Sequence, residues 1–164
     1  MTSILFLCTG NSARSILAEA LANHLGEGRL TTYSAGSFPK GAPHPMALAV
    51  LADHAITGEF SSKSWDVFAA AGAPPIDIVI TVCDNAAGEV CPIFPGRAVK
   101  AHWGIADPAA VEGAGQRAAF EQAFAEMQAR ITALLEMDLS DPAAPHVRAA
   151  LNDIGHMPGA TRRR

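Results

Sequence analysis

A cysteine, an arginine and a serine that could do chemistry stand near the start of the chain, as Cys8, Arg14 and Ser15. An apolar run over residues 4–7 precedes the cysteine, and apolar residues at helical spacing follow the arginine. The pattern predicts a tight turn over residues 8–15 that leads from a buried strand into a helix. Backbone amides in such a turn converge at the helix N-terminus, where they can bind a tetrahedral oxyanion. The segment therefore predicts an anion-binding loop with a thiol nucleophile at its base.

The residues of this loop have separate expected roles. Arg14 would add a planar, bidentate clamp for the anion. Its charge and the helix N-terminus would lower the pKa of Cys8, and Ser15 could donate its hydroxyl to the same sulfur. Gly10 and Asn11 suit a loop that needs left-handed backbone, so Asn11 is expected to be a scaffold residue. The expected anion-binding residues are Thr9, Gly10, Asn11, Ser12, Ala13 and Arg14. The alternative is that Cys8 is only a small core residue.

Two further cysteines follow in the middle of the chain. The apolar, β-branched run 76–82 ends at Cys83, so this cysteine also follows a predicted strand. The carboxyl ends of parallel strands share one edge of a sheet, and that edge carries the active site in open α/β folds. Residues 84–90 contain asparagine, glycine and acidic residues and predict a mobile segment that could carry Cys91 toward or away from Cys83.

Other interpretations of these residues stay open. Cys83 could be a buried strand residue and Cys91 an incidental loop residue. A metal site would use both cysteines and His102, but their spacing is longer than in short zinc motifs and no fourth ligand is evident. Asp107 could act as a general acid, or it could cap a helix that begins at Pro108, and the two roles are compatible.

The segment 8–15 resembles the anion-binding loop of the low-molecular-weight protein tyrosine phosphatases and of the arsenate reductases that share their fold. Segments 78–92 and 102–108 resemble the reductases of this family. The phosphatases commonly carry a second cysteine where this loop has Ala13, and tyrosines where alanines follow Pro108 here. The chain is therefore similar to the thioredoxin-coupled arsenate reductases.

The resemblance implies a relay of thiols. Cys8 would attack arsenate while Asp107 protonates the leaving oxygen, and Cys83 would then attack the sulfur of Cys8 and release arsenite. Cys91 would resolve that disulfide by exchange and leave a Cys83–Cys91 disulfide. Thioredoxin, or alternatively glutaredoxin, would reduce it, and phosphate or sulfate would mimic the substrate. The resemblance thus implies a redox-active disulfide and a role in arsenical resistance.

Two functions of other classes compete with this one. Hydrolysis of phosphomonoesters would need Cys8, Arg14 and Asp107 but would have no use for the other two cysteines. A binding module could sequester arsenite or a metal through its three thiols without turnover, but it would leave the loop and the aspartate unexplained.

No metal and no cofactor is expected. Some reductases of the family bind potassium beside the loop, through residues that would correspond to Asn11, Glu19, Ser34 and a polar cluster near Ser62 and Ser64. An acidic member of that cluster is replaced by serine in this chain.

Composition limits the remaining classes. The chain has 164 residues, of which 49% are hydrophobic, as expected for one domain with a substantial core. Its net charge is −4, and a basic run occurs only at Arg162–Arg164, so we expect no nucleic-acid partner. No apolar run approaches the length of a membrane span, and no basic leader precedes one, so we expect a cytoplasmic protein. We expect it to be a monomer. An odd number of cysteines in a reducing compartment disfavours a static disulfide framework.

The elements that must position these residues alternate between strand and helix. The expected strands are 4–8, 30–35, 76–83 and 98–102, and the expected helices are 14–25, 45–54, 64–71 and 115–137. This alternation predicts an α/β fold, and the resemblance implies a single-domain four-stranded parallel sheet of flavodoxin-like type. Residues 1–137 would form that domain. Residues 138–164 would be an extension with a short helix from Asp141 to about Leu151 and a mobile, arginine-rich end.

Overall fold

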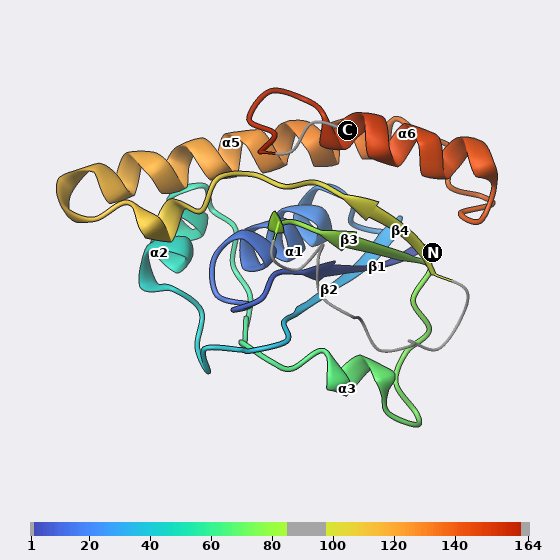
Figure 1. Ribbon diagram of the computed structural model, residues 1–164, viewed down its shortest axis with the longest axis horizontal. Helices are drawn as coiled ribbons and strands as arrows, with labels where there is room; N and C mark the ends of the chain where they lie inside the picture. The colour runs from blue at the N-terminus through green and yellow to red at the C-terminus, as the bar shows by residue number, and fades with distance from the viewer. Residues whose placement is uncertain (1, 85–97, 162–164) are drawn as a thin grey trace.

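Four parallel strands form the central sheet of the computed structural model, which describes residues 2–84 and 98–161. The strands are β1 (Thr2–Leu7), β2 (Leu30–Ala35), β3 (Ile78–Thr81) and β4 (Val99–His102). Their order across the sheet is β2-β1-β3-β4, and every pairing is parallel (Figure 1). The predicted α/β fold with a four-stranded parallel sheet is confirmed.

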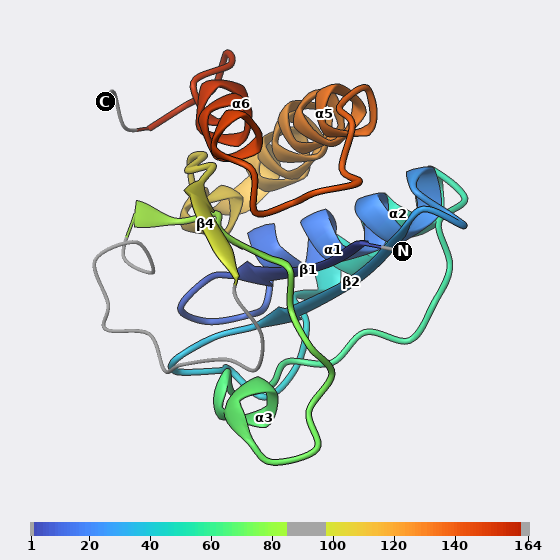
Figure 2. The ribbon, with the colours of Figure 1, turned by 90° about the vertical axis from the view of Figure 1, so that its right-hand side faces the viewer.

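Helices cover the sheet on both sides. They are α1 (Arg14–Leu25), α2 (Pro45–Asp53), α3 (Asp66–Ala69), α5 (Gln116–Leu135) and α6 (Pro145–Gly155), with short 3-10 turns at Pro108–Ala110 and Gly113–Gly115. Figure 2 shows α5 and α6 on one side of the sheet and α3 on the other. In the described part of the chain, no helix is both long enough and apolar enough to cross a membrane.

The two central strands hold the core. Residues 4–7 of β1 and Ile78 and Ile80 of β3 have no exposed surface, as expected for strands covered on both faces. The fully buried Trp103 packs against Phe6 with ring centroids 6.1 Å apart. Burial of each such large apolar side chain contributes about 1.5–3 kcal/mol. Cys8 and Cys83 thus follow the buried central strands at the carboxyl edge of the sheet.

Two predicted helices differ from the observed ones. The helix expected over 64–71 is reduced to the single turn of α3, because the backbone at Ala70 is already extended. The helix expected from Asp141 begins only at Pro145. The carbonyl of Asp141 accepts a hydrogen bond from the amide of Ala144 at 3.1 Å, which closes a turn, and proline then takes the first helical position. The predicted mobile segment around Cys91 lies outside the described residues.

Candidate active site

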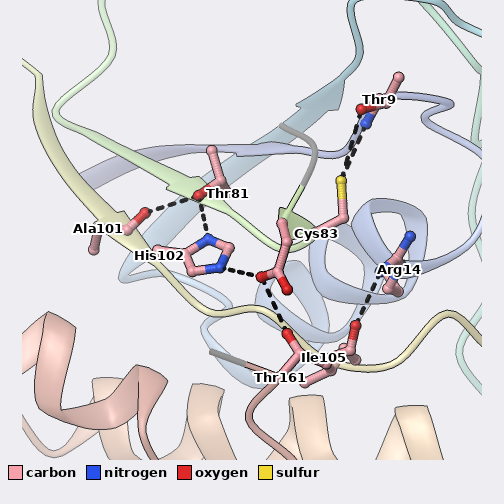
Figure 3. Close-up of polar contacts among 9 residues, drawn as sticks. Thr9, Arg14, Thr81, Cys83, Ala101, His102, Ile105 and Thr161 are labelled. Carbon is pink, nitrogen blue, oxygen red and sulfur yellow. Dashed lines mark hydrogen bonds and ion pairs between the residues drawn. The ribbon is translucent and has the colours of Figure 1, made fainter. Parts of the chain in front are cut away.

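The two described cysteines meet at the carboxyl edge of the sheet. Leu7 of β1 pairs with Thr81 of β3, so two residues further along each strand Thr9 lies beside Cys83. The amide of Thr9 donates a hydrogen bond to Sγ of Cys83 at 3.4 Å (Figure 3). Cys8 and Cys83 are 6% and 3% exposed, and their side chains share a hydrogen bond. The expectation that two strand ends bring these thiols together is met.

The peptides of the loop have a defined orientation. Three of its carbonyls accept hydrogen bonds from amides of segment 38–44, at 2.8–3.0 Å: Thr9 from Phe38, Gly10 from Lys40, and Ser12 from His44. In a trans peptide the carbonyl and the following N–H point in opposite directions. The amides of Gly10 and Ala13 therefore point away from segment 38–44, while the amide of Asn11 donates to the carbonyl of Cys8 at 3.0 Å. Successive loop amides of this kind are the donors that an anion-binding loop uses.

Asn11 is the scaffold of the loop. It is fully buried and has a left-handed backbone with φ 42°, as predicted, whereas Gly10 is outside that region. Its Oδ1 accepts a hydrogen bond from the amide of Lys63, and its Nδ2 donates to Oγ of Ser15, both at 2.8 Å. Ser15 therefore ties the loop to the first turn of α1, and its hydrogen bond to Cys8 stays a prediction.

Arg14 reaches from the start of α1 across the site. Its Nη1 donates to the carbonyl of Ile105 at 2.9 Å (Figure 3). Its Nη2 lies 3.7 Å from Oδ2 of Asp107. Its Nε is buried and has no hydrogen-bond partner among the described residues. A buried donor without a partner costs free energy, which an oxyanion in the loop would recover. Two neighbours thus hold the guanidinium, and its Nε–H is left for an anion.

Asp107 lies across the site from the anion-binding loop and has two contacts. Its Oδ1 accepts a hydrogen bond from the amide of Ala109 at 3.0 Å, which caps the 3-10 turn that begins at Pro108. Its other oxygen faces Arg14, and the side chain is 43% exposed. The predicted capping role is confirmed, and the position beside the loop also suits a proton donor.

Burial and a neighbouring thiol set the acidity of Cys8. The hydrogen bond with Cys83 and desolvation raise the pKa of Cys8 well above its usual range, and the charge of Arg14 lowers it by less. The lowered pKa expected from the sequence is therefore wrong for this arrangement. The expectation counted Arg14 and the helix N-terminus but did not include burial or the second thiol.

A pocket of about 540 Å³ holds the site. Its lining includes Cys8, Thr9, Gly10, Arg14, Cys83 and Asp107, together with Phe38, Lys40, Asp84 and Thr161. The glycine- and proline-rich segment 36–45 predicts a loop at the rim of the site, and Phe38 and Lys40 lie in it. The sequence singled out neither Asp84 nor Thr161 as part of the site. Thr161 carried no such signal.

A lysine lies beside the carboxylate for which potassium was considered. Oγ of Ser34 donates to Glu19 at 2.6 Å, and Nζ of Lys63 donates to the carbonyls of Ser34 and Ser61 at 3.0 and 2.8 Å. Burial raises the pKa of Glu19 and lowers that of Lys63, while their opposite charges act against both shifts. Lys63 therefore places a positive charge near Glu19. Among the described residues, no group of three or more His, Cys, Asp or Glu could hold a metal ion.

Comparison with known proteins identifies the family. The sequence model of the low molecular weight phosphotyrosine protein phosphatases matches residues 3–143. An arsenate reductase of Bacillus licheniformis is 36% identical over 137 residues, which are 82% of this chain and 95% of that protein. The chain belongs to this family, on its arsenate reductase branch. The resemblance inferred from the loop and the two later segments is confirmed.

Solved structures of the same branch are similar to this one. The arsenate reductase of Archaeoglobus fulgidus has a TM-score of 0.65 and 25% identity, and the match covers 82% of this chain and 99% of that one. A thioredoxin-dependent arsenate reductase of Corynebacterium glutamicum has a TM-score of 0.61 and 25% identity, over 83% of this chain and 61% of that one. Both agree with the fold of the family.

Within this family fold, Asp107→Asn separates capping from proton donation. Asparagine caps as well as aspartate does but donates no acidic proton. We expect kcat for hydrolysis of p-nitrophenyl phosphate to fall by about 10²-fold with little change in Tm. Asp138→Asn is the matched control, because Asp138 also accepts a hydrogen bond from an amide two residues on, at an exposed position. A rate and pH profile equal to those of the parent protein would assign Asp107 to capping alone.

The raised pKa of Cys8 predicts a pH dependence of its alkylation. The thiolate reacts, so the rate with iodoacetamide should be low at neutral pH and rise only above the pKa of an ordinary thiol, about 8.5. Cys83→Ala removes the largest cause of the shift, and the profile should move to lower pH. Mass spectrometry of the peptide that contains Cys8 measures both rates. Identical profiles for the two proteins would contradict the assigned cause.

Proposed function

We propose that this protein reduces arsenate to arsenite with Cys8, Cys83 and Cys91 as a relay of thiols. The observation that carries the proposal is the second thiol beside the first: Sγ of Cys83 accepts a hydrogen bond from the loop amide of Thr9. A hydrolase would have no use for a buried thiol there. The names of the relatives, which are arsenate reductases, support the same substrate.

The first step forms a bond between sulfur and arsenic. The loop amides and Arg14 hold the arsenate dianion, and Cys8 Sγ attacks arsenic. The hydroxyl of the dianion takes a proton from Asp107 and leaves as water, and the proton of the Cys8 thiol passes to Asp107, so the net charge is unchanged. Arsenic remains As(V) in this step.

The second step is the reduction. Cys83 Sγ attacks Sγ of Cys8, a disulfide forms, and the bond between sulfur and arsenic breaks. The electron pair of that bond stays on arsenic, which becomes As(III). Arsenite leaves after it takes protons from the thiol of Cys83 and from water. Two thiols have then lost two electrons, and arsenic has gained them.

The third step restores the first thiol. Cys91 attacks Cys83 Sγ, Cys8 leaves as a thiolate, and a Cys83–Cys91 disulfide results. An external dithiol then reduces that disulfide. We propose thioredoxin as this partner, supported by the similarity to the thioredoxin-dependent enzyme of C. glutamicum, with glutaredoxin as the alternative. A relay of reduced thiols operates in a reducing compartment, so we place the protein in the cytoplasm. We also expect it to be a monomer.

Hydrolysis of phosphomonoesters is the second candidate. The family model is that of phosphatases, and Cys8, Arg14 and Asp107 share one pocket. These three groups would suffice for transfer of a phosphoryl group to sulfur and then to water. A slow hydrolysis of aryl phosphates is expected beside the reduction, and it does not need Cys83 or Cys91.

A coupled assay tests the proposal. NADPH consumption is followed with arsenate and either thioredoxin and its reductase or glutathione and glutaredoxin. We expect turnover with thioredoxin and its loss, by more than about 10²-fold, in Cys91→Ser. The same variant should hydrolyse p-nitrophenyl phosphate at the rate of the parent protein. Absence of NADPH consumption with both reductants, together with rapid phosphate hydrolysis, would instead establish a phosphatase.

A further inference from the structure

The chain continues beyond the part that defines its family. The family model ends at residue 143, and α6 and the segment up to Thr161 follow it. These residues are packed on the domain: α6 lies against β4 and α5 (Figure 2). Val147 and Leu151 are fully buried in that contact. The part of the chain outside the family model therefore contributes to the core.

Buried polar groups of the domain bind this segment. Nε1 of Trp103 donates a hydrogen bond to the carbonyl of Leu151 at 2.8 Å. The guanidinium of Arg130, which has no exposed surface, donates to the carbonyls of Met157 and Pro158 at 3.0 and 3.2 Å. A buried arginine without these acceptors would be costly, so the segment after α6 is held in place.

The segment then reaches the active site. Ala160 forms an antiparallel bridge with Ile105, and the amide of Thr161 donates to the carbonyl of Gly104 at 3.1 Å. Ile105 is the residue whose carbonyl accepts from Arg14. Oγ1 of Thr161 donates to Oδ1 of Asp84 at 3.1 Å (Figure 3). Thr161 also lines the pocket with Cys8.

Asp84 is the neighbour of Cys83 and is held from two sides. Its Oδ1 lies 2.8 Å from Nε2 of His102, and Nδ1 of His102 lies 2.6 Å from Oγ1 of Thr81 (Figure 3). Thr161 supplies the second side. A Cβ on Gly104 would lie 2.6 Å from each of the three polar atoms, on Asp84, His102 and Thr161, so only glycine allows this close arrangement.

We propose that Thr161 is a positioning residue for Cys83, acting through Asp84. The hydroxyl of Thr161 and the ring of His102 together fix the carboxylate that directly follows Cys83 in the chain. Asp84 is the next residue after Cys83, so fixing its carboxylate also fixes the end of β3 and the sulfur of Cys83 beside the anion-binding loop. This inference rests on the proposed function, because the positioned thiol is the one that attacks Cys8.

Two variants test the hydroxyl of Thr161. Thr161→Val keeps the shape and the backbone hydrogen bond but removes the donor to Asp84, and Thr161→Ser keeps the donor. Both are made in a Cys91→Ser background, in which the relay stops at the Cys8–Cys83 disulfide. In a single turnover with arsenate and no reductant, that disulfide should form about tenfold more slowly in Thr161→Val and near the rate of the background protein in Thr161→Ser. Hydrolysis of p-nitrophenyl phosphate, which does not use Cys83, should fall by less than disulfide formation does in the same variant. Thr57→Val, an exposed site on another loop, is the matched control.

A second readout does not depend on arsenate. In a Cys8→Ser, Cys91→Ser background, Cys83 is the only thiol, and its alkylation by iodoacetamide reports how firmly it is held. Thr161→Val should raise that rate by about tenfold, because the end of β3 opens more often. Equal alkylation in Thr161→Val and Thr57→Val would overturn the inference. Failure of the parent protein to form the disulfide with arsenate would refute the proposed function instead, and alkylation would still decide whether Thr161 holds Cys83.

Discussion

Cys8→Ser is expected to lose arsenate reduction and aryl phosphate hydrolysis together, each by about 10⁴-fold or more. Both reactions begin with attack by the sulfur at the base of the loop, and a serine hydroxyl in the same buried place is a far weaker nucleophile. Serine is nearly isosteric, so the fold should be retained. Initial rates with arsenate in the coupled assay and with p-nitrophenyl phosphate measure the two losses.

Cys83→Ser is the matched control for this prediction, because it makes the same change of atom at the neighbouring thiol. It should lose multiple-turnover reduction but retain hydrolysis at the parent rate or above it, because loss of the Cys83 thiol removes the largest cause of the raised pKa of Cys8. Hydrolysis that survives in Cys8→Ser would show that another group is the nucleophile. Normal reduction in Cys83→Ser would exclude the relay.

Gly36→Ala is expected to displace the anion-binding loop and so to lower both activity and stability. A Cβ on Gly36 would lie 2.3 Å from the carbonyl oxygen of Cys8 and 2.4 Å from that of Thr9. Both are backbone atoms of the loop, so neither can move aside without moving the loop. The hydrogen bonds of Gly36 with Lys63 and Trp65 hold it in place from the other side. We expect a loss of about 2–3 kcal/mol in the free energy of unfolding and a large loss of activity.

Gly115→Ala provides the control for that substitution. A Cβ there would meet only a side-chain carbon of Val111 at 3.4 Å, which is ordinary contact. Urea denaturation measures the free energy of unfolding of both variants, and hydrolysis of p-nitrophenyl phosphate measures the state of the loop. Equal stability and activity of Gly36→Ala and Gly115→Ala would mean that the loop tolerates the displacement.

The acidity of Cys8 bears on the order of events in the proposed reaction. The hydrogen bond of Cys8 with Cys83 and its burial outweigh the charge of Arg14 and raise the pKa of Cys8, which favours the protonated thiol. Deprotonation therefore has to accompany substrate binding or attack. The closeness of Cys83 to Cys8, which allows the disulfide to form in the second step, thus also affects the attack of Cys8 on arsenic in the first step. Variants at Cys83 should therefore be assayed for both steps.

Local features of the sequence were sufficient to predict the loop. The apolar run before Cys8, the polar residues after it and the helical spacing after Arg14 all lie within a few residues, and α1 begins and ends where that spacing predicts. Asn11 likewise has the left-handed backbone expected of it. Backbone conformation in a short segment depends mainly on its own residues, so these predictions did not need the rest of the chain.

Contacts between distant segments decided the remainder. The register of β1 and β3 places Cys83 beside Cys8 and so sets the direction of the pKa shift. Asp107 shows its dual role only when Arg14, 93 positions earlier, lies opposite it. Thr161 reaches Asp84 only because α6 packs on the sheet. Burial and hydrogen bonding at a site depend on side chains that tertiary packing brings together, and a linear pattern does not contain their positions.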